Sequence, residues 1–209
     1  MLPFARTIAQ AVFAARPFSR LICWRGPRAG RRVALSFDDG PRPEFTPAVL
    51  DLLAAAGVKA TFFVEGCRAA KHPDLLRRVA AEGHEIGNHG FDHDGGSIVR
   101  QAERCGAVLR EAEISASLFR PALGRMGAGD VIRLRRRGYR SVIWSFDTHD
   151  SMRFEGKWRG AAPDYDAVRP GDIILMHDDN PVCVAELPAL LAALSRRGIG
   201  AVRVGELLG

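Results

Sequence analysis

Aspartate and histidine residues recur in this sequence directly after short apolar segments. The first such segment ends in the run Ser-Phe-Asp-Asp-Gly-Pro, which contains Asp38 and Asp39. Side chains alternate along a strand, so two adjacent aspartates point to opposite sides of the chain and can do different work. One carboxylate can bind a metal ion while the other accepts a proton. The simpler alternative is a turn, because Asp-Asp-Gly-Pro is also favourable turn chemistry.

A pair of histidines four residues apart follows a later apolar segment. His89 and His93 can converge on one ion from a loop or a helical turn, as imidazoles commonly do for zinc. Taken alone, such a pair is a weak signal and is more often two surface histidines. Together with Asp39 they would form three ligands and leave a position open for water, which is the arrangement of catalytic rather than structural zinc.

Further ionisable side chains follow other apolar segments. They occur as Arg120-Pro121, as Asp147-Thr148-His149-Asp150 and as His177-Asp178-Asp179. Five of the seven predicted strands end in this way. Solvated loops would also be polar, but they would not favour Asp and His so strongly over Lys, Glu and Ser. The clustering predicts an active site.

The elements that must position these residues alternate between strands and helices. We predict strands at Val33–Phe37, Ala60–Val64, His84–Gly87, Leu118–Arg120, Ser141–Phe146, Ile173–Met176 and Ala201–Val204. We predict five helices between these strands. Thr46 caps the first, which ends before Gly57, and Pro73 begins the second, which ends before Gly83. The third spans Ser97–Glu113, the fourth is capped by Asp130 and ends before Gly138, and the fifth spans Val184–Arg197. This pattern predicts an α/β fold with a parallel sheet, and both a doubly wound open sheet and a barrel fit it. In either case chemistry gathers at the carboxyl ends of the strands.

The composition is that of a globular domain with an unusual charge distribution. Of 209 residues, 47% are hydrophobic and 26% charged, which excludes disorder. The formal charge is +6, but residues 1–37 hold seven arginines and no acid, and the remaining 23 basic residues face 24 acidic ones. The body of the chain therefore has no basic bias, and nucleic acid is a poor candidate for a partner. We divide the chain into a basic extension, residues 1–30, and one domain, residues 31–209.

The extension itself has a weak helical pattern. Phe4, Ile8, Val12 and Ala15 recur every three or four residues, so residues 4–16 are predicted to form a short amphipathic helix. It is too short to span a membrane, and it lacks the apolar run and cleavage site of a secretory signal. A helix that packs on the domain is one interpretation, and peripheral contact with an anionic membrane surface is the other. We expect a cytoplasmic or membrane-surface location.

In the order of its motifs the sequence resembles the polysaccharide deacetylase family, also called the NodB homology domain or carbohydrate esterase family 4. The resemblance covers Arg32 to Leu208, nearly the whole domain. The matching motifs are Ser36–Pro41, His89 with His93, Phe119-Arg120-Pro121, Asp147 with Asp150, and Ile174–Asp178. It implies a distorted (β/α) barrel of about seven strands rather than an open sheet.

The resemblance also implies roles for individual residues. Asp39, His89 and His93 would hold a divalent metal, most often Zn²⁺, with Co²⁺, Ni²⁺ or Mn²⁺ as alternatives. Asp38 would be the general base, held by Arg120, and His177 the general acid, tuned by Asp150. Leu175 would line the pocket for the acetyl methyl, and a backbone N–H near Leu123 would bind the oxyanion. This division suits amide hydrolysis, which needs an activated water and a protonated leaving nitrogen.

Several positions depart from the pattern of the family. Gly90 and Asp92 replace hydroxyl residues that brace the metal loop, and we expect Asp92 to brace the loop in their place. Ala122, Leu123 and Ser151 replace residues that include two aromatics of the sugar groove. Phe154 and Trp158 are candidates for a replacement wall, and loop anchoring is the alternative for both.

We therefore expect a metal-dependent hydrolase that removes N-acetyl groups from amino sugars of a polysaccharide, oligosaccharide or glycolipid. The departures in the groove keep open a hydrolase of C–N bonds in a small non-sugar amide or cyclic imide. A non-catalytic carbohydrate-binding domain is a third possibility, and Asp38, Arg120 and His177 argue against it because a binding module needs neither base nor acid.

Overall fold

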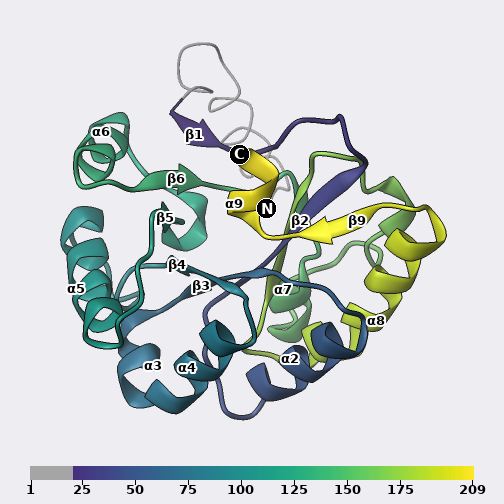
Figure 1. Cartoon of the computed structure of the whole chain (residues 1–209), viewed down its shortest axis with the longest axis horizontal. Helices are drawn as coiled ribbons and strands as arrows, with labels where there is room; N and C mark the ends of the chain where they lie inside the picture. Colours follow the sequence, from purple (N-terminus) through teal and green to yellow (C-terminus); the bar gives the residue numbers. More distant parts are fainter. Residues whose placement is uncertain (1–20) are drawn as a thin grey trace.

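The chain alternates strands and helices over its whole described length, residues 21–209 of a computed structural model (Figure 1). The strands are β1 (Ile22–Cys23), β2 (Arg32–Asp38), β3 (Thr61–Val64), β4 (Glu85–Asn88), β5 (Leu118–Phe119), β6 (Arg140–Val142), β7 (Phe146–Asp147), β8 (Ile173–His177) and β9 (Gly200–Val202). The helices are α2 (Thr46–Ala55), α3 (Gly66–Lys71), α4 (Pro73–Ala81), α5 (Ile98–Glu111), α6 (Ala128–Arg136), α7 (Asp150–Phe154), α8 (Pro181–Arg196) and α9 (Val204–Leu208), with 3-10 turns at Ala122–Gly124 and Tyr165–Ala167.

All strand pairs of the sheet are parallel, in the order β1-β6-β5-β4-β3-β2-β8-β7, and β9 also pairs with β2. One continuous segment joins the two ends of this sheet, because β6 pairs with β5 while β7 pairs with β8. In the link between β6 and β7, the Ser145 amide donates to the Ile173 carbonyl at 3.0 Å. The sheet therefore curves into an incomplete barrel with β1 and β7 as its outer strands, and the predicted distorted barrel is confirmed.

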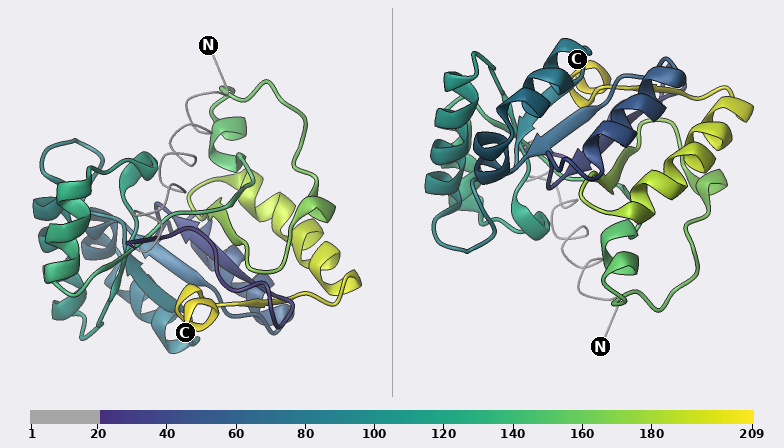
Figure 2. Two further views of the ribbon diagram at one scale, coloured as in Figure 1. Left: turned by 90° about the horizontal axis from the view of Figure 1, so that it is seen from above. Right: turned by 90° about the horizontal axis from the view of Figure 1, so that it is seen from below.

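The strands are buried on both faces, which explains their nearly continuous apolar sequences. One core cluster lies between the sheet and the surrounding helices and includes Leu35 and Phe37 of β2. A second contains residues of the opposite strand faces, such as Ala34 and Leu175. Figure 2 shows the helices on the outside of the strands from two further directions. The short α9 covers the amino-terminal end of the barrel, where its Gly205 amide donates to Glu85 Oε2 at 2.9 Å.

Some predicted boundaries were wrong. The predicted strand Ser141–Phe146 is divided into β6 and β7 where it crosses from one end of the sheet to the other. Thr46 does not cap α2, because its hydroxyl donates to the buried Asp178 Oδ2 at 2.6 Å. Asp130 lies in the first turn of α6, where its Oδ2 accepts from the Gly127 amide at 3.2 Å. Short elements such as α3 and α7 were not predicted, because they have too few residues for a periodic pattern.

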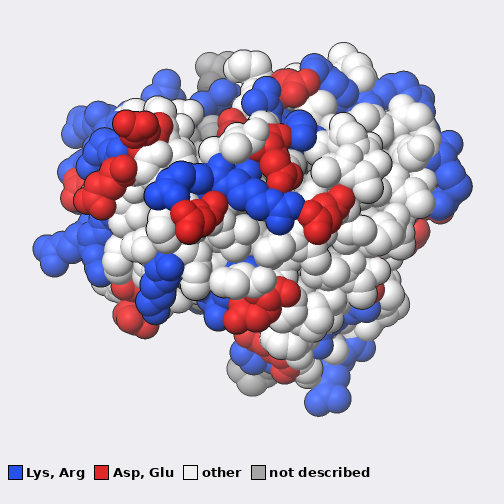
Figure 3. Space-filling model, turned by 60° about the horizontal axis from the view of Figure 1, so that its bottom comes forward, with Lys and Arg blue, Asp and Glu red and all other residues white. Residues whose placement is uncertain are grey.

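Part of the predicted basic extension belongs to the domain. Ile22 and Cys23 pair with β6, and the Arg25 guanidinium lies 2.7 Å from Asp172 Oδ1. The expected helix at residues 4–16 lies outside the described residues. Among residues 21–209, no helix is long and apolar enough to cross a bilayer. On the face shown in Figure 3, basic and acidic side chains are interspersed.

Candidate active site

The carboxyl end of β2 presents two adjacent carboxylates with different surroundings. Asp38 is the last residue of the strand and is 2% exposed. Asp39 has a φ of 72°, in the left-handed region that costs a non-glycine residue about 1–3 kcal/mol and often marks a functional position. The chain turns sharply here, and a Cβ on Gly40 would collide with the Asp178 carboxylate. The turn therefore needs glycine at position 40.

His89 and His93 lie beside Asp39. Asp39 Oδ1 is 3.1 Å from His89 Nε2 and 3.3 Å from His93 Nε2. The ligand atoms of the three residues all lie within 4.8 Å of one another. His89 is buried and His93 is partly open to solvent. The three side chains that the sequence predicted as a metal site are brought together.

These three residues fit a divalent metal. Asp39 Oδ1 is buried beside two imidazole nitrogens and yet makes no hydrogen bond of normal geometry with either. His89 Nδ1 lies 2.9 Å from the Arg120 carbonyl, which assigns its proton to Nδ1 and leaves Nε2 free to face an ion. One carboxylate and two imidazoles are ordinary zinc ligands.

The local charges also favour a cation here. Burial would raise the pKa of Asp39, but its contacts with His89 and His93 outweigh burial and hold that pKa well below its usual range. Burial would lower the pKa of His89, but the carboxylates of Asp38 and Asp39 outweigh it and raise that pKa. The contact with Asp39 raises the pKa of His93. The same field that favours a proton on these imidazoles favours a metal ion between them.

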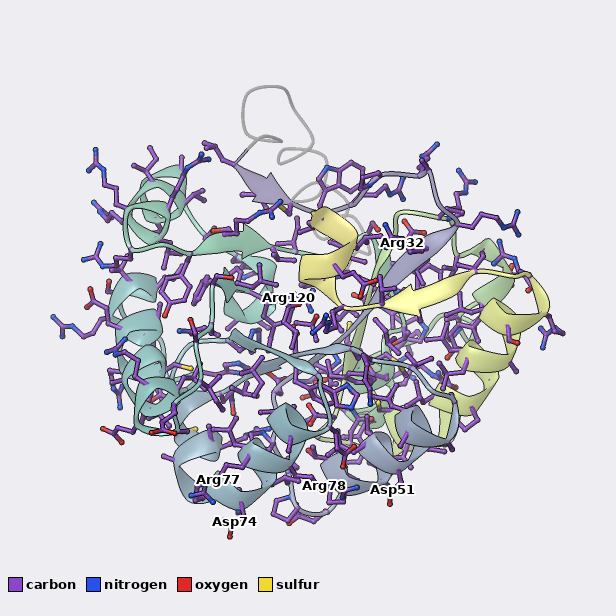
Figure 4. All side chains as sticks on the ribbon, in the orientation of Figure 1. Arg32, Asp51, Asp74, Arg77, Arg78 and Arg120 are labelled. Atoms are coloured by element: carbon purple, nitrogen blue, oxygen red, sulfur yellow. The ribbon has the colours of Figure 1, made fainter. Side chains whose placement is uncertain are left out.

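Arg120 holds Asp38 from inside the barrel. Its NH1 donates to Asp38 Oδ1 at 2.7 Å, and its side chain is fully buried. Figure 4 shows Arg120 near the centre of the ribbon, whereas Asp51, Asp74, Arg77 and Arg78 lie at its rim. The guanidinium also lies over the Phe63 ring, 4.0 Å from its centroid. A buried arginine with one carboxylate partner fixes the orientation of that carboxylate.

His177 and Asp150 form a second buried pair. His177 Nδ1 is 2.7 Å from Asp150 Oδ1, and the His177 amide donates to Asp150 Oδ2 at 2.8 Å. Burial alone would lower the pKa of His177, but the Asp150 carboxylate, with smaller help from Asp39 and Asp38, raises it to about 10. The imidazole therefore stays protonated at neutral pH, as a proton donor must.

The strand register explains why residues distant in sequence meet here. Asp38 is the register partner of His177, and Asn88, which precedes His89, is the partner of Phe119, which precedes Arg120. In a parallel sheet the carboxyl ends of neighbouring strands meet at one edge. The predicted catalytic and metal residues all lie on this edge or in the loops that follow it.

The three predicted substrate residues have different environments. Leu175 is 1% exposed and lies two residues before His177, on the same face of β8. Leu123 is 70% exposed with a φ of 57°. Trp158 stacks on His149 with ring centroids 3.8 Å apart, and its Nε1 donates to the Ala161 carbonyl at 3.0 Å. Trp158 is thus held in its loop, and its stacking on His149 is a contact that the sequence did not predict.

The metal loop is braced by a residue that the motifs did not identify. Gln101 Oε1 accepts from the amides of Phe91 and Asp92 at 2.9 and 3.0 Å, and its Nε2 donates to Asp92 Oδ1 at 2.7 Å and to the Gly95 carbonyl at 2.9 Å. The expectation that Asp92 would brace the loop is confirmed. The contribution of Gln101 gave no sequence signal, because it looks like any exposed helix residue.

Glu65 and Arg68 were also missed. Glu65 Oε1 is 3.1 Å from His93 Nε2, and its Oε2 is 2.5 Å from Arg68 Nε. Burial raises the pKa of Glu65, and the charge of Arg68 partly offsets that effect. Arg68 also donates to the Asp39 carbonyl. Neither residue belongs to a recognisable motif.

Comparisons with known proteins point in one direction. The model of a family described as polysaccharide deacetylase matches residues 25–140. A peptidoglycan-N-acetylglucosamine deacetylase of Bacillus cereus is 34% identical over 204 residues, covering 90% of this chain and 92% of its own. A chitooligosaccharide deacetylase of Bradyrhizobium is 38% identical over 190 residues, covering 80% and 86%. A crystal structure of a peptidoglycan N-acetylglucosamine deacetylase with 4-naphthalen-1-yl-N-oxidanyl-benzamide matches with a TM-score of 0.79 and 30% identity, over 93% of this chain and 97% of that one.

Proposed function

This chain belongs to the polysaccharide deacetylase family, and from that premise we propose that it is a metal-dependent hydrolase that removes N-acetyl groups from amino sugars of a glycan. The family match and the similar relatives confirm the resemblance that the sequence motifs indicated. The relatives named above are deacetylases of peptidoglycan and of chitooligosaccharides, which supports an N-acetylated sugar as the class of substrate.

One observation carries the proposal: the three metal-ligating side chains lie next to a base and an acid at one edge of the barrel. Asp39, His89 and His93 share one centre, Asp38 is 3.8 Å from His89, and Asp38 is the register partner of His177. A carbohydrate-binding domain would need no buried arginine to orient Asp38 and no carboxylate to keep His177 protonated. The arrangement therefore favours catalysis over binding alone.

The chemistry of amide hydrolysis assigns the roles. A divalent ion held by Asp39, His89 and His93 would supply Lewis-acid polarisation of the acyl oxygen and lower the pKa of water toward neutrality. Asp38 is the general base that takes the proton from the attacking water, and Arg120 keeps its carboxylate aimed at that water. His177 is the general acid that protonates the leaving amine nitrogen, and Asp150 keeps it charged until it does so. The Leu123 backbone N–H is the proposed donor to the oxyanion.

The surroundings of the site bear on the size of the substrate. Leu175 lies deeper than His177 on the same face of β8. We place the small pocket for the acetyl methyl beside it. The exposed Leu123 stands where the family has an aromatic, but the stacked His149 and Trp158 offer an aromatic face of the kind that sugar rings stack on. We propose Leu123, Leu175 and Trp158 as the substrate contacts.

The test compares products from two substrate classes. Purified protein supplied with Zn²⁺ should release acetate from N-acetylated chitooligosaccharides, and it should give neither ammonia nor ring-opened product from cyclic imides. Asp38→Asn should lower acetate release by about 10²–10⁴-fold. Imide opening without acetate release would instead support the small-amide hydrolase. A wild-type protein that shows no turnover and binds sugar as tightly as the Asp38→Asn variant would support a binding domain.

The location of the protein is a separate proposal. The seven arginines before Asp38 support peripheral contact with an anionic membrane on the cytoplasmic side. Deleting residues 1–20, which contain three of the seven arginines and the predicted amphipathic helix, should reduce co-sedimentation with vesicles of anionic lipid and leave turnover on a soluble substrate unchanged. Equal sedimentation of the full and shortened chains would refute this proposal.

A further inference from the structure

Arginines are concentrated in two separate stretches of this chain. Residues 1–37 hold seven arginines and no acid, and residues 114–146 hold another seven arginines and a single acid, Asp130. Arg120 in the second stretch is buried beside Asp38, so the other six arginines of that stretch face one acid. The body of the chain has no net basic bias, yet its arginines are unevenly distributed.

The fold brings the two basic stretches together. Ile22 and Cys23 of β1, from the first stretch, pair with Ser141 and Val142 of β6, from the second. Strand β1 is the outermost strand at this end of the sheet, and α6 packs against β6. Figure 1 shows α6, β6 and β1 in the upper left part of the molecule, away from α2 and α8. We call the surface formed by β1, β6 and the outer side of α6 the basic face.

The outer side of α6 consists of exposed side chains. Val131 and Leu134 are buried in the core. Four neighbouring side chains are exposed: Ile132, Arg133, Arg135 and Arg136. Because an α-helix has 3.6 residues per turn, these four residues fall on the side of α6 opposite the two buried ones. Figure 4 shows nitrogen-tipped side chains that extend outward around α6.

Only some of these positive charges are neutralised. Arg133 NH1 lies 3.3 Å from Asp130 Oδ1, and Arg137 Nε lies 2.6 Å from Glu103 Oε1. Both pairs are exposed, and exposed ion pairs attract only weakly in water. Arg135 and Arg136 have no carboxylate partner among residues 21–209. Uncompensated arginines raise the local potential and favour an anionic partner.

An apolar side chain stands among these charges. Among residues 21–209, three large apolar side chains are exposed, at Leu123, Ile132 and Phe154. Ile132 is 45% exposed and is the one that lies on α6 beside the arginines. A soluble polyanion makes no favourable contact with an exposed isoleucine. A bilayer surface takes up both groups, because its charged headgroups lie directly above an apolar layer.

The basic face leaves the candidate active site open. Helix α6 follows the carboxyl end of β5 through the turn Ala122–Gly124 and leads to the start of β6. Between parallel strands, such a helix runs along the side of the barrel from one edge to the other. A membrane that contacts α6 therefore lies beside the barrel and does not cover the edge that carries Asp39 and His177.

We propose that the basic face docks on a bilayer that contains anionic phospholipids, with Arg135 and Arg136 at the lipid phosphates and Ile132 in the interface. Each basic residue near such a surface strengthens binding about fivefold. The inference rests on the proposed membrane location and adds to it a surface within the folded domain. Because residues 1–20 directly precede β1 in the chain, both contacts can engage the same membrane.

The experiment measures how the full chain partitions onto sedimented vesicles. One set of vesicles mixes phosphatidylglycerol with phosphatidylcholine, and the other contains phosphatidylcholine alone. The double variant Arg135→Gln/Arg136→Gln removes two charges from α6. The matched control, Lys59→Gln/Lys71→Gln, removes two exposed charges outside the basic face. Every variant keeps residues 1–20, and circular dichroism establishes that each one is folded.

The full chain should sediment with the phosphatidylglycerol vesicles and stay in solution with phosphatidylcholine alone. The arginine variant should lower the partition coefficient at least about tenfold, and the lysine control should lower it less than about threefold. Ile132→Asn should weaken the binding that remains at high salt, where the arginines are screened, and Ile132→Leu should preserve it.

Equal losses in the arginine variant and the lysine control would overturn the proposal, and so would a full chain that does not sediment. Binding to soluble polyphosphate but not to vesicles would also overturn it, because the partner would then be a polyanion without an apolar layer. Failure of the contact proposed for residues 1–20 is a different result: their deletion would leave sedimentation unchanged while the arginine variant still reduced it. Failure of the proposed deacetylase would appear as the absence of acetate release, whatever the vesicles show.

Discussion

Asp38 and Asp39 are neighbours in the chain, but their carboxylates have different partners. Asp38 Oδ1 lies against the Arg120 guanidinium, and Asp39 Oδ1 lies between two imidazoles. Strand alternation predicts that the two side chains diverge, and this division of roles was expected on that basis. Alternation does not predict the positive φ of Asp39, which depends on the turn through Gly40 and on the packing of Asp178 beneath it.

His177→Ala tests the role of the proposed acid. Loss of the imidazole should lower kcat on an N-acetylated oligosaccharide by about 10²–10⁴-fold, because the leaving nitrogen is then protonated only by solvent. Metal content, measured by elemental analysis, should equal that of the wild type, since His177 is not among the proposed ligands. A variant that lost its metal would show that His177 had been assigned the wrong role.

Asp150→Asn tests the electrostatic contribution to that acid. Burial lowers the pKa of His177, and the Asp150 carboxylate more than reverses this effect. Removing the carboxylate should therefore lower the pKa, so the proton is lost at lower pH. The alkaline limb of kcat/KM, which reports the free enzyme, should move to lower pH by one unit or more. An unchanged alkaline limb would mean that another group sets it.

At the scale of elements, the metal loop depends on the helix that follows it. Residues 89–93 contain both metal histidines, and the side chain of Gln101 on α5 makes the four hydrogen bonds described above to residues 91–95. The loop and helix together form the unit that places His93. Such contacts between a side chain and a loop backbone are not visible in a sequence, because they depend on the path of the loop.

Gln101→Ala should weaken Zn²⁺ binding about tenfold, because the loop then loses the hydrogen bonds that hold His93 near Asp39. Saturating Zn²⁺ should restore most of kcat, since no reacting group is removed. Arg100→Ala, an exposed change on the same helix, is the matched control and should leave the Zn²⁺ dissociation constant unchanged. Equal affinities of the wild type and Gln101→Ala would contradict the role of the brace.

The longer elements could be predicted, and the short ones could not. Strands β2 and β8 and helices α5 and α8 have enough residues for an apolar pattern, and each was predicted within a few residues of its observed ends. Strand β1 has two residues and α7 has five, so neither has a detectable period. Site residues that follow the long strands were found, whereas Glu65, Arg68 and Gln101 lie outside any motif.

For the whole molecule, the sequence pattern left an open sheet and a barrel equally possible. The family resemblance implied the barrel, and the structure gives the physical reason. The segment from Arg140 to Thr148 pairs first with β5 and then with β8, so it crosses from one side of the curved sheet to the other. This crossing brings Asp150, the first residue of α7, against His177 at the end of β8. The fold thus completes the acid that the proposed reaction needs.

Asp39, His89 and His93 are proposed to hold an ion without which no acetyl group is released. The most direct measurement is acetate release from a chitooligosaccharide, followed with metal content, after thorough chelation and again after Zn²⁺ or Co²⁺ is returned. Activity should disappear with the metal and reappear as about one ion per chain is bound, and Asp39→Asn should recover neither. Full acetate release from protein in which elemental analysis finds no metal would contradict the account.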